Sequence, residues 1–157
     1  TGLADGSHTL EVSAVDAAGN VDPTPASYTW TVDTSPPDTA ITSQPADPTA
    51  SVDAVFAFSA PDGTATFECS LDGGAFTPCA TGQSYQGLAE GAHAFAVRAV
   101  DAAGNVDPTP ATYAWTVDTT APDTSIVSGP ADPTNQTSAS FTFGSPDPTA
   151  TFQCVLF

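Results

Sequence analysis

The chain repeats itself at a fixed interval, and this repeat limits the folds open to it more than any other feature does. The segment from Asp16 to Ala26 recurs, without a change, 85 positions later as Asp101 to Ala111. When residues 1–72 are aligned with residues 86–157 without a gap, 46 of the 72 paired positions are identical. Such regularity marks a structural unit copied in tandem. The unit has the size of a small β-sandwich domain.

Two proline-containing stretches, residues 33–38 and 118–123, divide the chain into copies of the unit. Proline stiffens a linker and stops strand pairing from running across it. The expected division is residues 1–34 as the C-terminal half of one unit, residues 35–119 as a complete unit, and residues 120–157 as the N-terminal half of a third. A chain divided in this way is either an excerpt from a longer array or a subunit whose ends are completed by a neighbour.

Apolar residues of the complete unit alternate with period two, which is typical of half-buried strands. The residues expected to share an inward face, strand by strand, are Ala54, Phe56 and Phe58, then Phe67, Cys69 and Leu71, then Phe95, Val97 and Ala99, then Tyr113, Trp115 and Val117. Asp72-Gly73-Gly74 predicts a hairpin turn, and a further strand is expected around Ile41. We therefore predict an all-β fold with about seven strands per unit in two sheets.

The three cysteines suggest one disulfide and half of another. Cys69 and Cys79 flank the predicted turn, which places them nearly opposite each other across a hairpin. Oxidised, they would stabilise the unit by about 2–3 kcal/mol on the chain-entropy model. Cys154 repeats Cys69, so its partner is expected outside this chain. The alternative is buried free thiols. A disulfide would indicate an oxidising, extracytoplasmic compartment, and a zinc site is disfavoured because no second ligand lies at zinc-binding spacing.

The charge of the chain excludes several classes of partner. It has 18 acidic residues, one arginine and no lysine, for a formal net charge of −17. Such a chain repels the phosphates of nucleic acids and the surface of anionic membranes. It also lacks the run of about 20 apolar residues that spans a bilayer, and we expect any export signal to lie outside this fragment. Bound Ca²⁺, a salty habitat or simple solubility would each explain the acidity.

Acidic and amide side chains gather near the two linkers. They are Asp101, Asn105, Asp107, Asp118 and Asp123, repeated in the preceding copy as Asp16, Asn20, Asp22, Asp33 and Asp38. Ca²⁺ takes six to eight oxygen ligands of this kind, so a junctional Ca²⁺ site is one hypothesis, and no other cofactor is indicated. The alternative is that these residues form turns, as Asp and Asn do beside Gly and Pro, and the spacing is not that of an EF-hand.

His8 and His93 occupy the same position in two copies, each just after a glycine and at the start of a predicted strand. A catalytic histidine needs a nucleophile and an orienting carboxylate around it, whereas a residue repeated at a strand start is typical of a structural role. No nucleophile elbow, phosphate-binding loop or dinucleotide fingerprint is present. We therefore expect that the chain is not an enzyme.

Several segments together resemble bacterial Ig-like repeat domains of large secreted and cell-surface proteins. They are residues 67–74 with Cys79, residues 97–105 and residues 115–122. The resemblance implies Ig-like sandwiches in tandem that act as a stalk, spacer or adhesive array. The chain departs from antibody domains, in which the disulfide joins the two sheets and packs on a tryptophan of an early strand. Here Cys69 and Cys79 are local and Trp115 lies near the end of the unit.

These features favour an extracellular or cell-surface structural array, in the form of a stalk, fibre, filament or sheath, whose partners are neighbouring copies of the repeat. In a sharper version, residues 120–157 and residues 1–34 of separate chains complete one another by strand addition, without an equivalent of residues 73–85. One alternative is an adhesive module that binds a host or matrix glycan, for which Tyr85 is the clear candidate among loop aromatics. Another is an accessory region of a large secreted enzyme.

Overall fold

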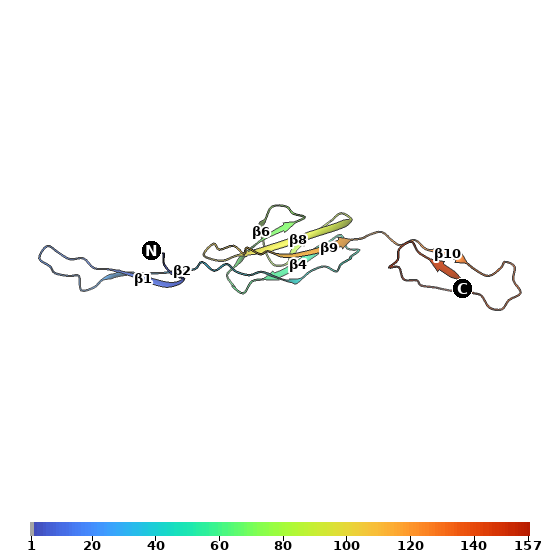
Figure 1. Ribbon diagram of the computed structural model, residues 1–157, viewed down its shortest axis with the longest axis horizontal. Helices are drawn as coiled ribbons and strands as arrows, with labels where there is room; N and C mark the ends of the chain where they lie inside the picture. The colour runs from blue at the N-terminus through green and yellow to red at the C-terminus, as the bar shows by residue number, and fades with distance from the viewer. Residues whose placement is uncertain (1) are drawn as a thin grey trace. The chain divides into compact units, whose positions relative to one another are not determined.

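The computed structural model describes residues 2–157, which form strands and loops (Figure 1). The strands are β1 (Gly6–Val12), β2 (Ala26–Val32), β3 (Ala40–Ser43), β4 (Ala54–Ser59), β5 (Thr66–Leu71), β6 (Thr77–Cys79), β7 (Gln83–Tyr85), β8 (Gly91–Val100), β9 (Ala111–Val117), β10 (Ser125–Ser128) and β11 (Thr142–Gly144). The all-β prediction is confirmed. Within these described residues there is no helix that could cross a membrane.

The chain divides into two units, Thr1–Asp118 and Thr119–Phe157. The first contains the hairpin β1–β2 and a sandwich of β3 to β9. One sheet of the sandwich has the strand order β3-β4-β7, and the other has the order β6-β5-β8-β9. All strand pairs within these two sheets are antiparallel. Residues 40–117 therefore contain the seven strands in two sheets that the alternating pattern predicted.

The core of the sandwich consists of eight of the twelve residues that the alternation placed inward. It is made of Ala54, Phe56, Phe58, Cys69, Phe95, Val97, Trp115 and Val117. Phe56 stacks on Phe95 across the two sheets with ring centroids 4.0 Å apart, and Trp115 meets Phe56 edge-on at 5.3 Å. These offset and edge-to-face contacts add to the free energy gained by burying the rings.

The turn after β5 is correctly predicted, and the length of the connection that contains it sets the register of the two cysteines. Asp72 and Gly73 have positive φ angles of 51° and 73°, as a type I′ turn requires, and the Gly74 amide donates to the Leu71 carbonyl. The Cys69–Cys79 disulfide is present, with the Cα atoms 5.8 Å apart. The two cysteines are not directly opposite, because the five-residue connection 72–76 sets a register that pairs Cys69 with Thr77.

The β1–β2 hairpin is a copy of β8–β9 without the rest of the sandwich. Gly6 pairs with Val32, just as Gly91 pairs with Val117, and the pairing continues in the same register. The environments differ, however. Leu10 is 55% exposed, whereas its counterpart Phe95 is 1% exposed. The strands β1 and β2 thus present an uncovered apolar face.

The second unit repeats the beginning of the sandwich. Ile126 of β10 pairs with Phe143 of β11, as Ile41 of β3 pairs with Phe58 of β4. Phe143 is 40% exposed and Phe58 is 3% exposed. An open apolar groove of about 520 Å³ lies in this unit. Its lining includes Ile126, Phe141, Phe143, Phe152 and Cys154. Cys154 is a free, exposed thiol, and its expected partner outside the chain remains a prediction.

Candidate functional site

The repeated acidic loop between β8 and β9 is closed by the carboxylate of Asp101. Its Oδ1 accepts hydrogen bonds from the amides of Ala103 and Asn105, at 2.9 and 2.8 Å, and its Oδ2 accepts one from Asn105 Nδ2 at 2.8 Å. These donors, with the Asn105 side chain the strongest influence, lower the pKa of Asp101. Both oxygens are therefore used to fold the loop, as the turn interpretation expects.

The same loop is present in the first copy with the same bonds. Asp16 Oδ1 accepts from the amides of Ala18 and Asn20, and its Oδ2 accepts from Asn20 Nδ2 at 2.7 Å. This loop closes although residues 2–34 lack the sandwich around it, so its geometry depends on local hydrogen bonds rather than on core packing.

The linker between the first and second copies is held by side chains on both sides of it. From the second copy, Asn105 Nδ2 donates to the Asp33 carbonyl at 3.0 Å, in addition to its bond with Asp101. From the first copy, Asp5 Oδ1 accepts from the Thr34 hydroxyl at 2.7 Å and from the Thr34 amide at 3.2 Å. Asp5 Oδ2 accepts from the Ser35 hydroxyl at 3.2 Å.

We call these contacts of Asp5 and Asn105 with residues 33–35 the linker clasp. The Thr34 hydroxyl is the main cause of the lowered pKa of Asp5. The sequence pattern places Asn105 and Asp33 near a junction, but Asp5 carries no motif and was not predicted. Its position before a glycine and a strand start, repeated as Glu90, is the one signal that could have identified it.

Asp107 has a different role from its neighbours, because it points into the sandwich. It is 2% exposed, and its Oδ1 accepts from the Thr109 amide at 2.8 Å. Its Oδ2 is buried and has no hydrogen-bond partner among the described residues. Burial acts to raise the pKa of Asp107, but nearby Thr39 and Thr109 lower it below the ordinary value. The Thr39 hydroxyl also accepts from the Ala99 amide at 2.8 Å, which ties the residue after the linker to β8.

The remaining residues of the Ca²⁺ hypothesis form other hydrogen bonds or are exposed. Asp118 follows β9, and its amide donates to the Thr49 carbonyl. Asp38 and Asp123 are exposed, and Asp22 accepts from Thr24 as Asp107 does from Thr109. Within residues 2–157, no three His, Cys, Asp or Glu side chains converge on a common point that could hold a metal ion. Junctional Ca²⁺ binding remains a prediction that a titration must test.

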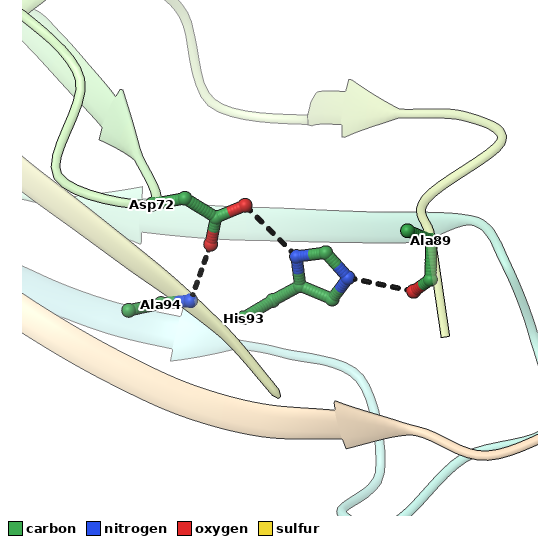
Figure 2. Close-up of polar contacts among 4 residues, drawn as sticks. All are labelled: Asp72, Ala89, His93 and Ala94. Atoms are coloured by element: carbon green, nitrogen blue, oxygen red, sulfur yellow. Dashed lines mark hydrogen bonds and ion pairs between the residues drawn. The ribbon is translucent and has the colours of Figure 1, made fainter. Parts of the chain in front are cut away.

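His93, near the start of β8, bridges the hairpin turn and the residues just before that strand (Figure 2). Its Nδ1 lies 2.9 Å from Asp72 Oδ2, and its Nε2 lies 2.8 Å from the Ala89 carbonyl. Asp72 Oδ1 accepts from the Ala94 amide at 2.8 Å. Both ring nitrogens of His93 therefore face acceptors, which leaves neither free to take a proton from a substrate. This geometry supports the structural role expected for His93.

The protonation of this pair follows from the same contacts. The Ala89 carbonyl is the largest cause of the raised pKa of His93, followed by the Asp72 carboxylate. Burial acts to raise the pKa of Asp72, but the Ala94 amide and His93 lower it further than burial raises it. Both shifts favour the charged forms, an imidazolium on His93 and a carboxylate on Asp72. The sequence pattern does not indicate this pairing, because Asp72 also suits the turn that it predicts.

Arg98 is engaged in contacts with neighbouring side chains. The one arginine, Arg98, makes two contacts with Glu68 Oε2, through Nε at 2.8 Å and Nη2 at 2.7 Å. It also lies over the Phe76 ring, 4.3 Å from its centroid.

Tyr85 was expected in a loop, but this expectation is wrong. It lies in β7 and packs edge-on against Phe56 and Phe95, because the alternation of β7 turns its ring onto the core. It is not an exposed platform for a sugar ring.

Comparisons with known proteins do not assign a family. No protein-family model matches the chain, and no curated protein matches its sequence.

Proposed function

We propose that the chain is part of an extracellular structural array, in which Ig-like sandwiches follow one another on linkers that side chains restrain. It acts as a spacer in a stalk, fibre or sheath and carries no catalytic site. Its partners are neighbouring copies of the same repeat. The observation that carries this proposal is the linker clasp, because both of its side chains stand at repeated positions of the unit.

The strand order supports the Ig-like assignment. The sheet β6-β5-β8-β9 has the arrangement of the Ig sheet that contains strands C, F and G with one added strand beside C. The sheet β3-β4-β7 then corresponds to strands A, B and E. The disulfide joins neighbouring strands of one sheet, β5 and β6, rather than the two sheets. This local bond stabilises each unit by itself, as a modular array requires.

The disulfide also supports the extracellular location, because such bonds form and persist in oxidising compartments. The net charge of −17 favours solubility of a long array and disfavours nucleic-acid partners. The partly buried position of Tyr85 removes the one aromatic residue that had favoured the glycan-binding alternative.

The clasp limits how far neighbouring domains can move relative to each other, so that the array acts as a spacer. A free linker would let neighbouring units move independently. Hydrogen bonds from both sides to residues 33–35 restrict that motion. Each exposed bond contributes at most about 1 kcal/mol. We therefore expect the linker to be stiffened rather than locked.

Nitrogen-15 relaxation of the linker amides tests this proposal. We expect order parameters near 0.85 for residues 34 and 35 in the wild type, falling toward 0.6 or below in Asn105→Ala. Asn20→Ala is the matched control, since it breaks the same loop bond in the first copy without touching this linker. Linker amides that are already flexible in the wild type, or unchanged in Asn105→Ala, would refute the spacer proposal.

A further inference from the structure

We propose that the loop between β10 and β11 is a site of N-linked glycosylation, with Asn135 as the acceptor. Asn135-Gln136-Thr137 fits the acceptor triplet Asn-x-Ser/Thr, in which x is any residue except proline. The inference rests on the extracellular location in the proposed function, because N-linked glycans belong to surface loops of secreted chains. A triplet serves as an acceptor only where the fold exposes it, so the structure of the loop decides the matter.

The loop is exposed, and its position stays exposed in a complete unit. Every residue from 131 to 140 is exposed. In the complete unit, the counterpart of Asn135 is Ala50, between β3 and β4, and it is exposed although all seven strands are present. Ser51 and Val52, the counterparts of the rest of the triplet, are exposed as well. A glycosylating enzyme can therefore reach this position in a complete unit.

The backbone of the loop takes the same turn in both copies. The Gln136 amide donates to Thr134 Oγ1 at 3.1 Å, and the Ser51 amide donates to Thr49 Oγ1 at 3.1 Å. By this local bond the threonine side chain closes a turn over the residue that follows it. Asn135 is that residue, so its counterpart in the complete unit shows where the acceptor lies.

In the complete unit, this turn is fixed against the end of β9. The Thr49 amide donates to the Thr116 carbonyl at 2.9 Å, and the Thr49 carbonyl accepts from the Asp118 amide at 2.8 Å. Asp118 is the residue at which the linker to the next copy begins. A glycan on this loop would therefore stand at the linker end of its unit, where a bulky hydrophilic group shields exposed chain from proteases.

Asn135 uses its side-chain amide differently from the other two asparagines of the chain. Asn20 and Asn105 each donate from Nδ2 to the aspartate four positions earlier, at 2.7 and 2.8 Å. Both are followed by Val-Asp, so neither belongs to an acceptor triplet. Asn135 instead accepts at Oδ1 from Gln136 Nε2 at 3.1 Å. That bond uses the oxygen and not Nδ2, which is the atom to which the sugar is attached.

The reaction joins Asn135 Nδ2 to the anomeric carbon of an oligosaccharide. The donor is a lipid-linked oligosaccharide diphosphate, which the secretory compartment supplies. The bond between the anomeric carbon and the phosphate oxygen breaks, and the lipid diphosphate leaves with the electron pair. Nδ2 loses one proton, and nothing is oxidised or reduced. The Thr137 hydroxyl stands two positions on, where the triplet requires it.

Secretion of the full chain from a eukaryotic host, followed by intact mass spectrometry, tests the site. We expect one glycan per chain, which peptide N-glycosidase removes. Asn135→Gln and Thr137→Ala should each abolish the modification. Ser138→Ala is the matched control, because it removes an exposed hydroxyl next to the triplet and should leave the glycan in place. An unmodified secreted wild type, or a glycan that persists in Asn135→Gln, would overturn the inference.

A second acceptor tests whether the loop of a complete unit can be glycosylated. The double variant Ala50→Asn, Val52→Thr places the triplet at the equivalent positions of the sandwich. We expect this chain to carry two glycans. A secreted chain with a single glycan would contradict the argument from exposure in a complete unit, and would overturn the assignment of this loop as an acceptor site of the repeat.

The outcomes separate this inference from the proposed function. Secretion is imposed by the host in these experiments, so an unmodified chain would refute the glycosylation site and leave the spacer proposal standing. The order parameters of residues 34 and 35 test the linker clasp separately. A glycosylated chain with a flexible linker would refute the spacer proposal alone.

Discussion

Replacing Phe95 with alanine tests whether the two sheets share one core. The Phe95 side chain is 1% exposed and stacks on Phe56. Removing such a ring costs about 3–5 kcal/mol through lost burial and the cavity left behind. The free energy of unfolding of a small domain is about 5–15 kcal/mol, so a large share of it would be lost. With a urea dependence of about 2 kcal/mol per M, the midpoint of unfolding should fall by roughly 2 M.

Urea unfolding followed by tryptophan fluorescence measures this shift. A Trp30→Phe background leaves Trp115, which is 2% exposed in the core, as the reporter. Leu10→Ala is the matched control, because Leu10 holds the equivalent position in β1 but is 55% exposed. In dilute protein it should change the stability of the sandwich by less than about 0.5 kcal/mol. A loss below about 1 kcal/mol for Phe95→Ala would refute the packing described for the core.

Three further predictions concern the disulfide, the histidine and calcium. Cys79→Ala should lower the free energy of unfolding of the sandwich by about 2–3 kcal/mol, whereas Cys154→Ser should leave it unchanged in dilute protein; urea denaturation compares the two. The His93–Asp72 pair should stabilise the sandwich most between the ordinary pKa values of 3.8 and 6.5. Below that window the contribution is lost as Asp72 is protonated at its lowered pKa, and above it as His93 loses its proton at its raised pKa. Thermal melts against pH should show the loss above this window in the wild type and in His8→Gln but not in His93→Gln, in which the loss at low pH should remain because the Ala94 amide still bonds to Asp72. If junctional Ca²⁺ binds, calorimetric titration of metal-stripped protein should give heat and a raised melting temperature; neither effect at millimolar Ca²⁺ would contradict the hypothesis.

Much of the fold could be predicted because it depends on local patterns. The period-two alternation identified Phe56, Val97 and Trp115 as core residues, and all three are buried. The turn at Asp72-Gly73 follows from the positive φ angles that its two central positions need. The Cys69–Cys79 disulfide followed from the same hairpin, and the structure contains it.

The contacts that were missed join residues far apart in the sequence. Asp72 and His93 are 21 positions apart, and Asn105 lies 72 positions from Asp33. The local sequence pattern indicates neither pair, because each contact depends on how the sheets and the linker are placed. The diagonal offset of Cys69 from Cys79 was missed because the length of the connection 72–76, and not the turn residues, sets the register.

Tyr85 was misplaced for a related reason. Its strand has three residues, which is too short for an alternating pattern to show against the glycines around it. Burial also differs between equivalent positions such as Val12 and Val97, at 57% and 0% exposed. The residue is valine at both positions, and the difference lies in which other strands of the unit are present to cover it.

Amide hydrogen exchange on the full chain is the most direct test that one complete sandwich lies between two uncovered halves of the same unit. In dilute protein, the amides of Val97 and Cys69 should exchange only through global unfolding, whereas those of Val12 and Cys154 should exchange through local opening. Equal protection of Val12 and Val97 in dilute protein, or rapid exchange at all four positions, would contradict this description.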